Sequence, residues 1–228
     1  MKIRAIAATV VLAGAATGAT WLGRPATELG DETPQEAMTF FITSAGPGDG
    51  ANLGGLEGAD AHCETLAAAQ EAGGRDWMAY LSTISDDGSA AVNARDRIGS
   101  GPWHNHGGVL IADNIDELHS DAANLTKETI LTEVGDMVNG RGDDPNMHDI
   151  LTGSNMDGTA YTGEGYDNCG NWTSNSAEGS AAVGHHDRTG GGQNPTSWNS
   201  AHPSRGCGQE NLQRTGGNGF FYCFAAGG

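Results

Sequence analysis

Two adjacent histidines, followed by an acid and an arginine, form the densest group of chemically active side chains in this sequence. His185, His186, Asp187 and Arg188 lie between two glycines. Imidazole and carboxylate groups bind transition metals, and with a guanidinium they hydrogen-bond sugars or carboxylates. The segment is therefore a candidate ligand-binding loop. A hydrogen-bonded loop brace fits the same residues, because adjacent histidines alone are a weak metal signal.

A second polar segment, residues 139–149, combines carboxylates with turn-forming residues. Its acids include Asp143, Asp144 and Asp149. Ca²⁺ takes hard oxygen ligands from such loops, so these three aspartates are a candidate calcium site. The spacing does not match an EF-hand, and a solvated turn explains the composition as well.

The sequence lacks the common signatures of hydrolytic enzymes. It contains no Gly-x-Ser-x-Gly elbow and no His-Glu-x-x-His helix. His104-Asn105-His106 spells a nuclease-like triplet, but an acidic chain lacks the basic surface that a nuclease needs for phosphates. We therefore predict a protein that is not an enzyme.

The charge balance excludes whole classes of partner. Lys and Arg number 11 against 29 Asp and Glu, which gives a formal net charge of −18, and 37 of the 228 residues are glycine. Such a charge repels nucleic-acid phosphates and anionic membranes and favours cations. Glycine at this density supplies turns rather than core side chains, so a single domain with long loops is expected.

The N-terminus predicts export. Lys2 and Arg4 precede an apolar run that ends at Ala19 with small residues suited to signal peptidase. We expect a signal peptide over residues 1–19, a flexible lead-in over 20–37 and one domain over 38–228. The mature protein is then secreted or periplasmic, without membrane insertion. An uncleaved N-terminal anchor is the alternative.

The four cysteines predict two disulfides. Oxidising compartments preserve disulfides, and the count is even. A zinc–thiolate site is the weaker alternative, because the sequence has no Cys-x-x-Cys pair. Three pairings of Cys63, Cys169, Cys207 and Cys223 are open on these grounds.

Short apolar segments must position the polar loops, and their pattern predicts an α+β fold. A helix is expected over residues 59–72, where apolar residues recur at helical spacing, and a shorter one after the capping residue Asn114. Residues 121–201 lack periodicity, but their tryptophans and cysteines favour an ordered irregular region. The expected strands are 38–43, 77–82, 109–111 and 219–225, the last aromatic and central in the sheet.

The order of these segments resembles the C-type lectin-like fold. Within that superfamily the chain is most similar to the endostatin-type branch and to a group of bacterial secreted proteins described as lectins. The resemblance spans residues 38–225 and rests on the order of the motifs and the placement of the cysteines. The motifs are Gly58–Cys63, Trp77–Ser82, Asp116–Leu118, Thr152–Gly158, Cys169–Thr173 and Phe220–Cys223.

The resemblance implies a mixed antiparallel sheet with two helices, a long irregular loop region and two nested disulfides. The implied pairs are Cys63–Cys223 and Cys169–Cys207. The first would join the helix to the terminal strand, and the second would close the irregular region, where burial alone supplies little stability.

The resemblance also indicates where a ligand binds. C-type lectins hold Ca²⁺ through a Glu-Pro-Asn or Gln-Pro-Asp loop and a Trp-Asn-Asp strand. Here the loop motif is absent, and Trp198-Asn199-Ser200 has serine in place of the carboxylate, which removes one calcium ligand. Trp198 also fits a core position. If the second bridge forms, His202 and Arg205 join the loop at residues 185–188 in one candidate site.

Three functions follow from these observations. The favoured prediction is a secreted, non-catalytic, lectin-like protein that binds glycans through polar loops, with Ca²⁺ as the candidate cofactor. The alternative is an endostatin-like module that binds or adheres to a cell-surface or extracellular protein. A metal-dependent hydrolase built on His185, His186 and Asp187 is the third.

Overall fold

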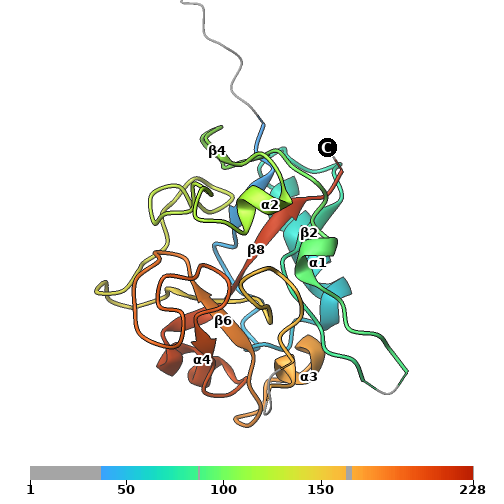
Figure 1. Ribbon diagram of the computed structural model, residues 1–228, viewed down its shortest axis with the longest axis vertical. Helices are drawn as coiled ribbons and strands as arrows, with labels where there is room; N and C mark the ends of the chain where they lie inside the picture. Colours follow the sequence, from blue (N-terminus) through green and yellow to red (C-terminus); the bar gives the residue numbers. More distant parts are fainter. Residues whose placement is uncertain (1–36, 87, 163–165, 228) are drawn as a thin grey trace, which may run out of the picture. The chain divides into compact units, whose positions relative to one another are not determined.

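The structure is a computed structural model that describes residues 37–86, 88–162 and 166–227 (Figure 1). The predicted signal peptide and the lead-in as far as residue 36 lie outside these residues. Among the described residues, no helix has both the length and the apolar character needed to span a bilayer. The fold is mixed α/β, with one large mixed sheet and two disulfides.

The described residues contain four α-helices, twice the number expected, and eight β-strands. The helices are α1 (Gly55–Ala68), α2 (Ile115–Leu118), α3 (Asn168–Trp172) and α4 (Gln209–Thr215). The strands are β1 (Phe40–Ile42), β2 (Trp77–Ala79), β3 (Trp103–His104), β4 (Leu110–Ala112), β5 (Asp149–Leu151), β6 (Ala182–His185), β7 (His202–Pro203) and β8 (Gly217–Ala225). The two unexpected helices, α3 and α4, give almost no periodic signal. The residues inside α3 have left-handed backbone angles, and α4 buries only Leu212.

Helix α1 begins and ends four residues earlier than its apolar pattern suggested. The expected stop was Gly73-Gly74, but Glu71 takes a left-handed conformation with φ 58°. The amide of Ala72 then donates back to the carbonyl oxygen of Ala67 at 3.0 Å, which closes the helix. The shorter helix α2 begins where expected, because the Asn114 side chain accepts a hydrogen bond from the amide of Glu117 at 3.0 Å.

Strand β8 is the centre of the large sheet, as its aromatic sequence predicted. The strand order is β1-β8-β5-β6-β7, and β2 also pairs with β8. The β5–β8 pairing is parallel, whereas the other strand pairs of this sheet are antiparallel. In Figure 1, β8 runs through the middle of the ribbon.

Both faces of β8 are buried, each in its own hydrophobic cluster. Phe221 and Cys223 belong to one cluster, and Tyr222 and Phe224 belong to the other. Alternate residues of a strand point to opposite faces, so this one segment supplies side chains to two cores. The irregular region between residues 121 and 201 packs around them, and it also contributes β5, α3 and β6.

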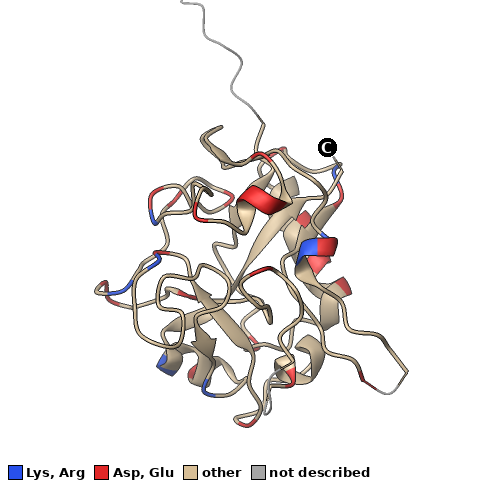
Figure 2. Cartoon of the chain, viewed as in Figure 1, with Lys and Arg blue, Asp and Glu red and all other residues tan. Residues whose placement is uncertain are grey.

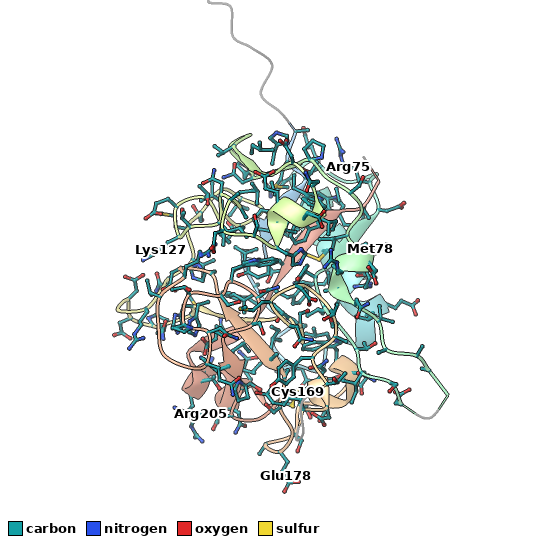
Figure 3. All side chains as sticks on the ribbon, viewed as in Figure 1. Arg75, Met78, Lys127, Cys169, Glu178 and Arg205 are labelled. Atoms are coloured by element: carbon teal, nitrogen blue, oxygen red, sulfur yellow. A yellow bond between two sulfur atoms is a disulfide. The ribbon has the colours of Figure 1, made fainter. Side chains whose placement is uncertain are left out.

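The two disulfides join Cys63 to Cys223 and Cys169 to Cys207, which confirms the nested pairing. The first links α1 to β8 with a Cα–Cα distance of 5.7 Å. The second holds α3 to the segment just before α4 with a Cα–Cα distance of 5.5 Å (Figure 3, where Cys169 is labelled beside α3). The irregular region is therefore anchored covalently at α3.

Candidate metal centre

Three short strands bring polar residues that are distant in sequence to one face of the sheet. In the β5–β6 pair Asp149 lies opposite His185, and in the β6–β7 pair His202 lies opposite Val183. Cross-strand partners point to the same face, and Val183 shares a face with His185 because side chains alternate along a strand. Asp149, His185 and His202 therefore project to the same side. His148, directly before β5, completes the group, which we call the His–Asp cluster.

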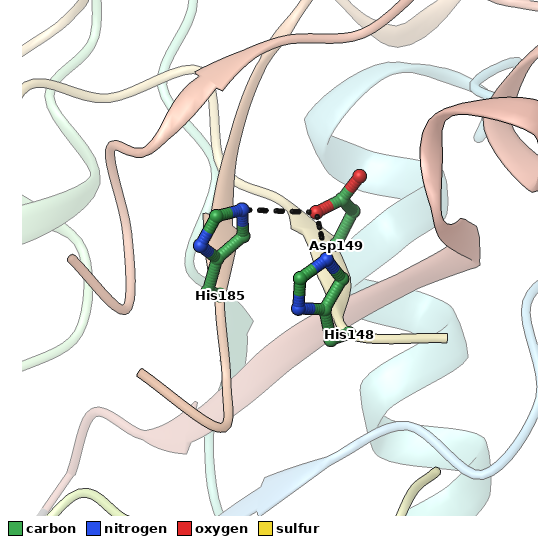
Figure 4. A group of neighbouring side chains, drawn as sticks. All are labelled: His148, Asp149 and His185. Atoms are coloured by element: carbon green, nitrogen blue, oxygen red, sulfur yellow. Dashed lines mark ion pairs between the residues drawn. The ribbon is translucent and has the colours of Figure 1, made fainter. Parts of the chain in front are cut away.

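Three imidazole rings bring a nitrogen close to one carboxylate oxygen. The Oδ1 atom of Asp149 lies 3.2 Å from Nε2 of His148, 3.3 Å from Nε2 of His185 and 3.4 Å from Nε2 of His202. Figure 4 shows the His148 and His185 rings directed at this oxygen. The side chains of Asp149 and His185 are 1% and 0% exposed, whereas that of His202 is 21% exposed. The cluster is thus enclosed, with its open side at His202.

The other ring nitrogen of each histidine has a partner that can only accept a hydrogen bond. Nδ1 of His185 donates to the carbonyl oxygen of Pro195 at 2.8 Å, and Nδ1 of His202 donates to that of Pro203 at 3.0 Å. Nδ1 of His148 donates to Oδ1 of Asp187 at 3.2 Å. In the neutral rings these bonds place the proton on Nδ1 and leave a lone pair on every Nε2. A histidine oriented by a carboxylate or a carbonyl is typical of metal ligands.

With neutral rings the cluster therefore assembles four electron-pair acceptors, and a protonated His202 would add one donor to Asp149. Among the described residues, both oxygens of Asp149 and Nε2 of His185 are buried without a hydrogen-bond partner. Such an arrangement is costly unless a cation or added protons fill it. The ligand atoms of a tetrahedral zinc ion, bound at about 2.0–2.1 Å, lie about 3.3 Å apart. The three measured nitrogen–oxygen distances agree with that spacing. The ligand atoms of His148, Asp149 and His185 all lie within 4.8 Å of one another, whereas His202 does not belong to this group and lies at its open side.

Local electrostatics keep both aspartates of this region ionised. Burial raises the pKa of Asp149, but the contacts with His185 and His202 outweigh it, so the pKa falls below its usual value. The contact with Asp149 in turn raises the pKa of His202. Burial likewise raises the pKa of Asp187, but His148 and the backbone amides of Arg141 and Thr189 lower it strongly. A negative charge at Asp149 is what a metal site requires.

Glycine backbone packs directly against the cluster. A Cβ atom at Gly190 would overlap the ring of His185, and one at Gly216 would lie 3.1 Å from Oδ2 of Asp149. Both glycines also have positive φ, at 148° and 128°. The Gly-rich sequence around residues 190–192 and 216–217 is therefore required for these rings and this carboxylate to approach one another.

The structure divides the sequence-predicted site residues into two groups. Asp149, His185 and His202 belong to the cluster, and Asp187 orients His148. His186 points elsewhere, because its Nε2 donates to the carbonyl oxygen of Asn139 at 3.1 Å. Burial lowers the pKa of His186, which favours its neutral form.

The remaining predicted residues lie apart from the cluster or on its rim. Arg205 lines a pocket beside it, and Arg188 lies 3.5 Å from the exposed carboxylate of Asp121. Asp143 pairs with Lys127. Asp144 is exposed, and of the three aspartates proposed as one calcium site only Asp149 belongs to a group of possible metal ligands among the described residues.

His148 is the member of the His–Asp cluster that was not predicted from the sequence. It lies beside Asp149 in the acidic segment, and a His-Asp pair followed by a short apolar strand was the available signal. Its role depends on the pairing of β5 with β6, which joins residues far apart in the chain.

Trp198 and Asn199, predicted to bind ligand, are both buried. Trp198 packs against the rings of Tyr80 and Tyr222 at centroid distances of 4.8 and 5.3 Å. Nδ2 of Asn199 donates to Tyr80 Oη at 2.9 Å and to the carbonyl oxygen of Asn155 at 3.1 Å. The side chains of both residues thus stabilise the interior.

Replacing Asn199 with alanine is expected to destabilise the fold by about 3 kcal/mol, because buried hydrogen-bonding groups lose their partner. Urea unfolding followed by tryptophan fluorescence measures this loss. Arg188→Ala is the matched control from the same predicted set, and its loss should stay below about 1 kcal/mol because its ion pair is exposed. Equal losses in the two variants would contradict the interior role of Asn199.

A second group of possible metal ligands among the described residues is Asp167, Cys169 and Cys207. Both of its sulfur atoms are joined in a disulfide, so neither is a thiolate. The His–Asp cluster is therefore the stronger candidate centre. Neither a scan against protein-family models nor a search of curated proteins found a match to this chain.

Proposed function

We propose that this protein binds a divalent transition metal ion, zinc in the first instance, through His148, Asp149 and His185, with His202 at the open side of the site. The observation that carries the proposal is the convergence of ring nitrogens on one buried, unpaired carboxylate oxygen, with the ligand atoms of His148, Asp149 and His185 all within 4.8 Å of one another. A bound cation satisfies the carboxylate and both ring nitrogens at once.

The chemistry of these donors favours zinc over the calcium expected from the sequence. Two imidazole nitrogens and one carboxylate oxygen suit Zn²⁺ and related transition ions. Ca²⁺ needs six to eight oxygen ligands, and the cluster offers one carboxylate. Asp143 and Asp144, the other two aspartates of the expected calcium site, contribute no ligand atom to the cluster.

The wider proposal is an exported lectin-like module on a C-type lectin-like scaffold of the endostatin type. The nested disulfides, the central terminal strand and the long ordered loops support this assignment. Disulfides also favour a secreted or periplasmic location.

Elemental analysis of protein purified without chelator tests the metal proposal. We expect one zinc ion per chain, and cobalt substitution should give the intense visible absorption of a tetrahedral site. His185→Ala should lose the ion, whereas His62→Ala, a histidine outside the cluster, should keep it. Protein that remains metal-free after incubation with zinc, or equal metal content in the two variants, would refute the proposal.

A further inference from the structure

The His–Asp cluster opens into a pocket of 430 Å³, which is within the size range of small-molecule sites. Its lining residues carry polar side chains or bare backbone, with Pro203 as the one apolar side chain. Two of the three proposed zinc ligands, His148 and His185, line it together with His202. The lining residues are Arg141, Asn146, His148, His185, Gly191, Gly192, His202, Pro203, Arg205 and Thr215.

Two arginines at this pocket lack a carboxylate partner. Most basic residues of the described chain lie within 4.0 Å of a carboxylate, namely Arg95, Arg97, Lys127, Arg188 and Arg214. Arg75, Arg141 and Arg205 do not form such an ion pair with any described residue. The guanidinium of Arg205 donates to the carbonyl oxygen of Arg214 at 3.2 Å and to no carboxylate of the described residues. Two of these three arginines therefore line the pocket at the metal centre (Figure 3, Arg205 labelled).

Two neighbouring arginines without an ion pair are unusual in so acidic a chain. With 29 acids against 11 basic residues, a surface arginine readily finds a carboxylate, and Figure 2 shows how sparse the basic residues are. The two charges of a bound zinc ion are already offset by Asp149 and Asp187. The guanidiniums of Arg141 and Arg205 thus remain as uncompensated positive charge above the ion, in a pocket whose lining includes no carboxylate.

We propose that the pocket binds a sugar acid, whose carboxylate occupies the open side of the zinc ion and pairs with Arg141 and Arg205. This inference rests on the metal site proposed above. Three protein ligands leave a coordination position of zinc open, which here is on the side of His202. Arginine recognises carboxylates through paired N–H donors.

The rest of the pocket favours a polyhydroxylated ligand over an apolar one. Nδ2 of Asn146 donates no hydrogen bond to any described residue, so it is available to a sugar hydroxyl. A Cβ atom at Gly191 would meet no other atom within 4 Å, so the pocket is unobstructed at this residue. A peptide with apolar side chains would find only Pro203 to pack against.

The test uses zinc-loaded protein titrated by calorimetry with a galacturonate oligosaccharide, its methyl ester and an unrelated peptide with a free C-terminal carboxylate. We expect binding of the acid and at least about 10-fold weaker binding of the ester. Arg141→Ala and Arg205→Ala should each weaken binding of the acid about 10-fold with zinc content unchanged. Arg75→Ala, the third unpaired arginine, is the matched control and should bind normally. In cobalt-substituted protein the acid should shift the visible spectrum, because its carboxylate enters the coordination shell.

The outcomes separate the two proposals. Protein that holds no metal refutes the proposed function, and with it this inference. Protein that binds one zinc ion but shows no heat and no spectral shift with the acid refutes the inference alone. Equal affinity for the acid and its ester would show that the pocket does not recognise the carboxylate. Tighter binding of the peptide than of the sugar acid would show that the pocket binds a different class of ligand. Either result overturns the proposal.

Discussion

Asp149→Asn should reduce zinc affinity by at least about 100-fold, since it removes the only anionic ligand of the centre while keeping its shape. The same substitution should remove the stabilisation that zinc gives to the folded state. For the unsubstituted protein this stabilisation is about 2.7 kcal/mol when free zinc exceeds its dissociation constant 100-fold. Competition against a chromophoric chelator measures the affinity, and thermal unfolding with and without zinc measures the stabilisation.

Asp144→Asn is the matched control for that experiment. Asp144 lies in the same acidic segment as Asp149 and is exposed. The Asp144→Asn variant should therefore retain both the zinc affinity and the stabilisation by zinc. If Asp149→Asn kept the zinc affinity of the unsubstituted protein, the carboxylate would not be a ligand. If both variants lost it equally, the effect would come from overall charge rather than from the cluster.

Replacing Cys63 and Cys223 together with alanine should cost about 5 kcal/mol in the free energy of unfolding, the largest loss that we expect from any disulfide in the chain. The bridge closes a loop of 160 residues and joins α1 to the central strand. Loop-closure entropy grows with loop length, so the unfolded chain gains most freedom when this bridge is removed. Urea unfolding of the double variant under non-reducing conditions measures the loss.

The comparison variant removes Cys169 and Cys207, whose loop spans 38 residues. The same relation gives about 4 kcal/mol, so this variant should be the more stable of the two. It should also release α3 and the loop around it, which limited proteolysis between residues 166 and 181 would detect. A reversed order of stability would show that native contacts, rather than loop entropy, govern the two bridges.

The parts of the fold that could be predicted from sequence are those with strong local signals. Cys63 lies in a helical pattern and Cys223 in an aromatic strand, so their elements were identified and the resemblance supplied the pairing that the structure confirms. The cap at Asn114 likewise fixed the start of α2. In these cases a few residues that are neighbours in the sequence determine the local structure.

The candidate site depended instead on strand register, which no local pattern contains. β5 and β6 have three and four residues, and their pairing sets Asp149 opposite His185 across the sheet. Sequence reasoning therefore included Asp149 in an acidic calcium loop and left out His148. The His185-His186 pair shows the same limit, because their side chains diverge at the end of β6 and only His185 reaches the cluster.

The position of β8 along the chain constrains how the protein reaches its native state. Its partners β1, β2 and β5 are all synthesised earlier, yet both cores need side chains from β8. A chain emerging from the ribosome or an export channel thus exposes Phe40, Phe41 and Trp77 without anything to cover them until residues 217–225 arrive. Pairings that span so much sequence form slowly. We expect folding to be all-or-none and to wait for residues 217–225, with partial chains that lack them susceptible to proteases and dependent on chaperones that hold them unfolded.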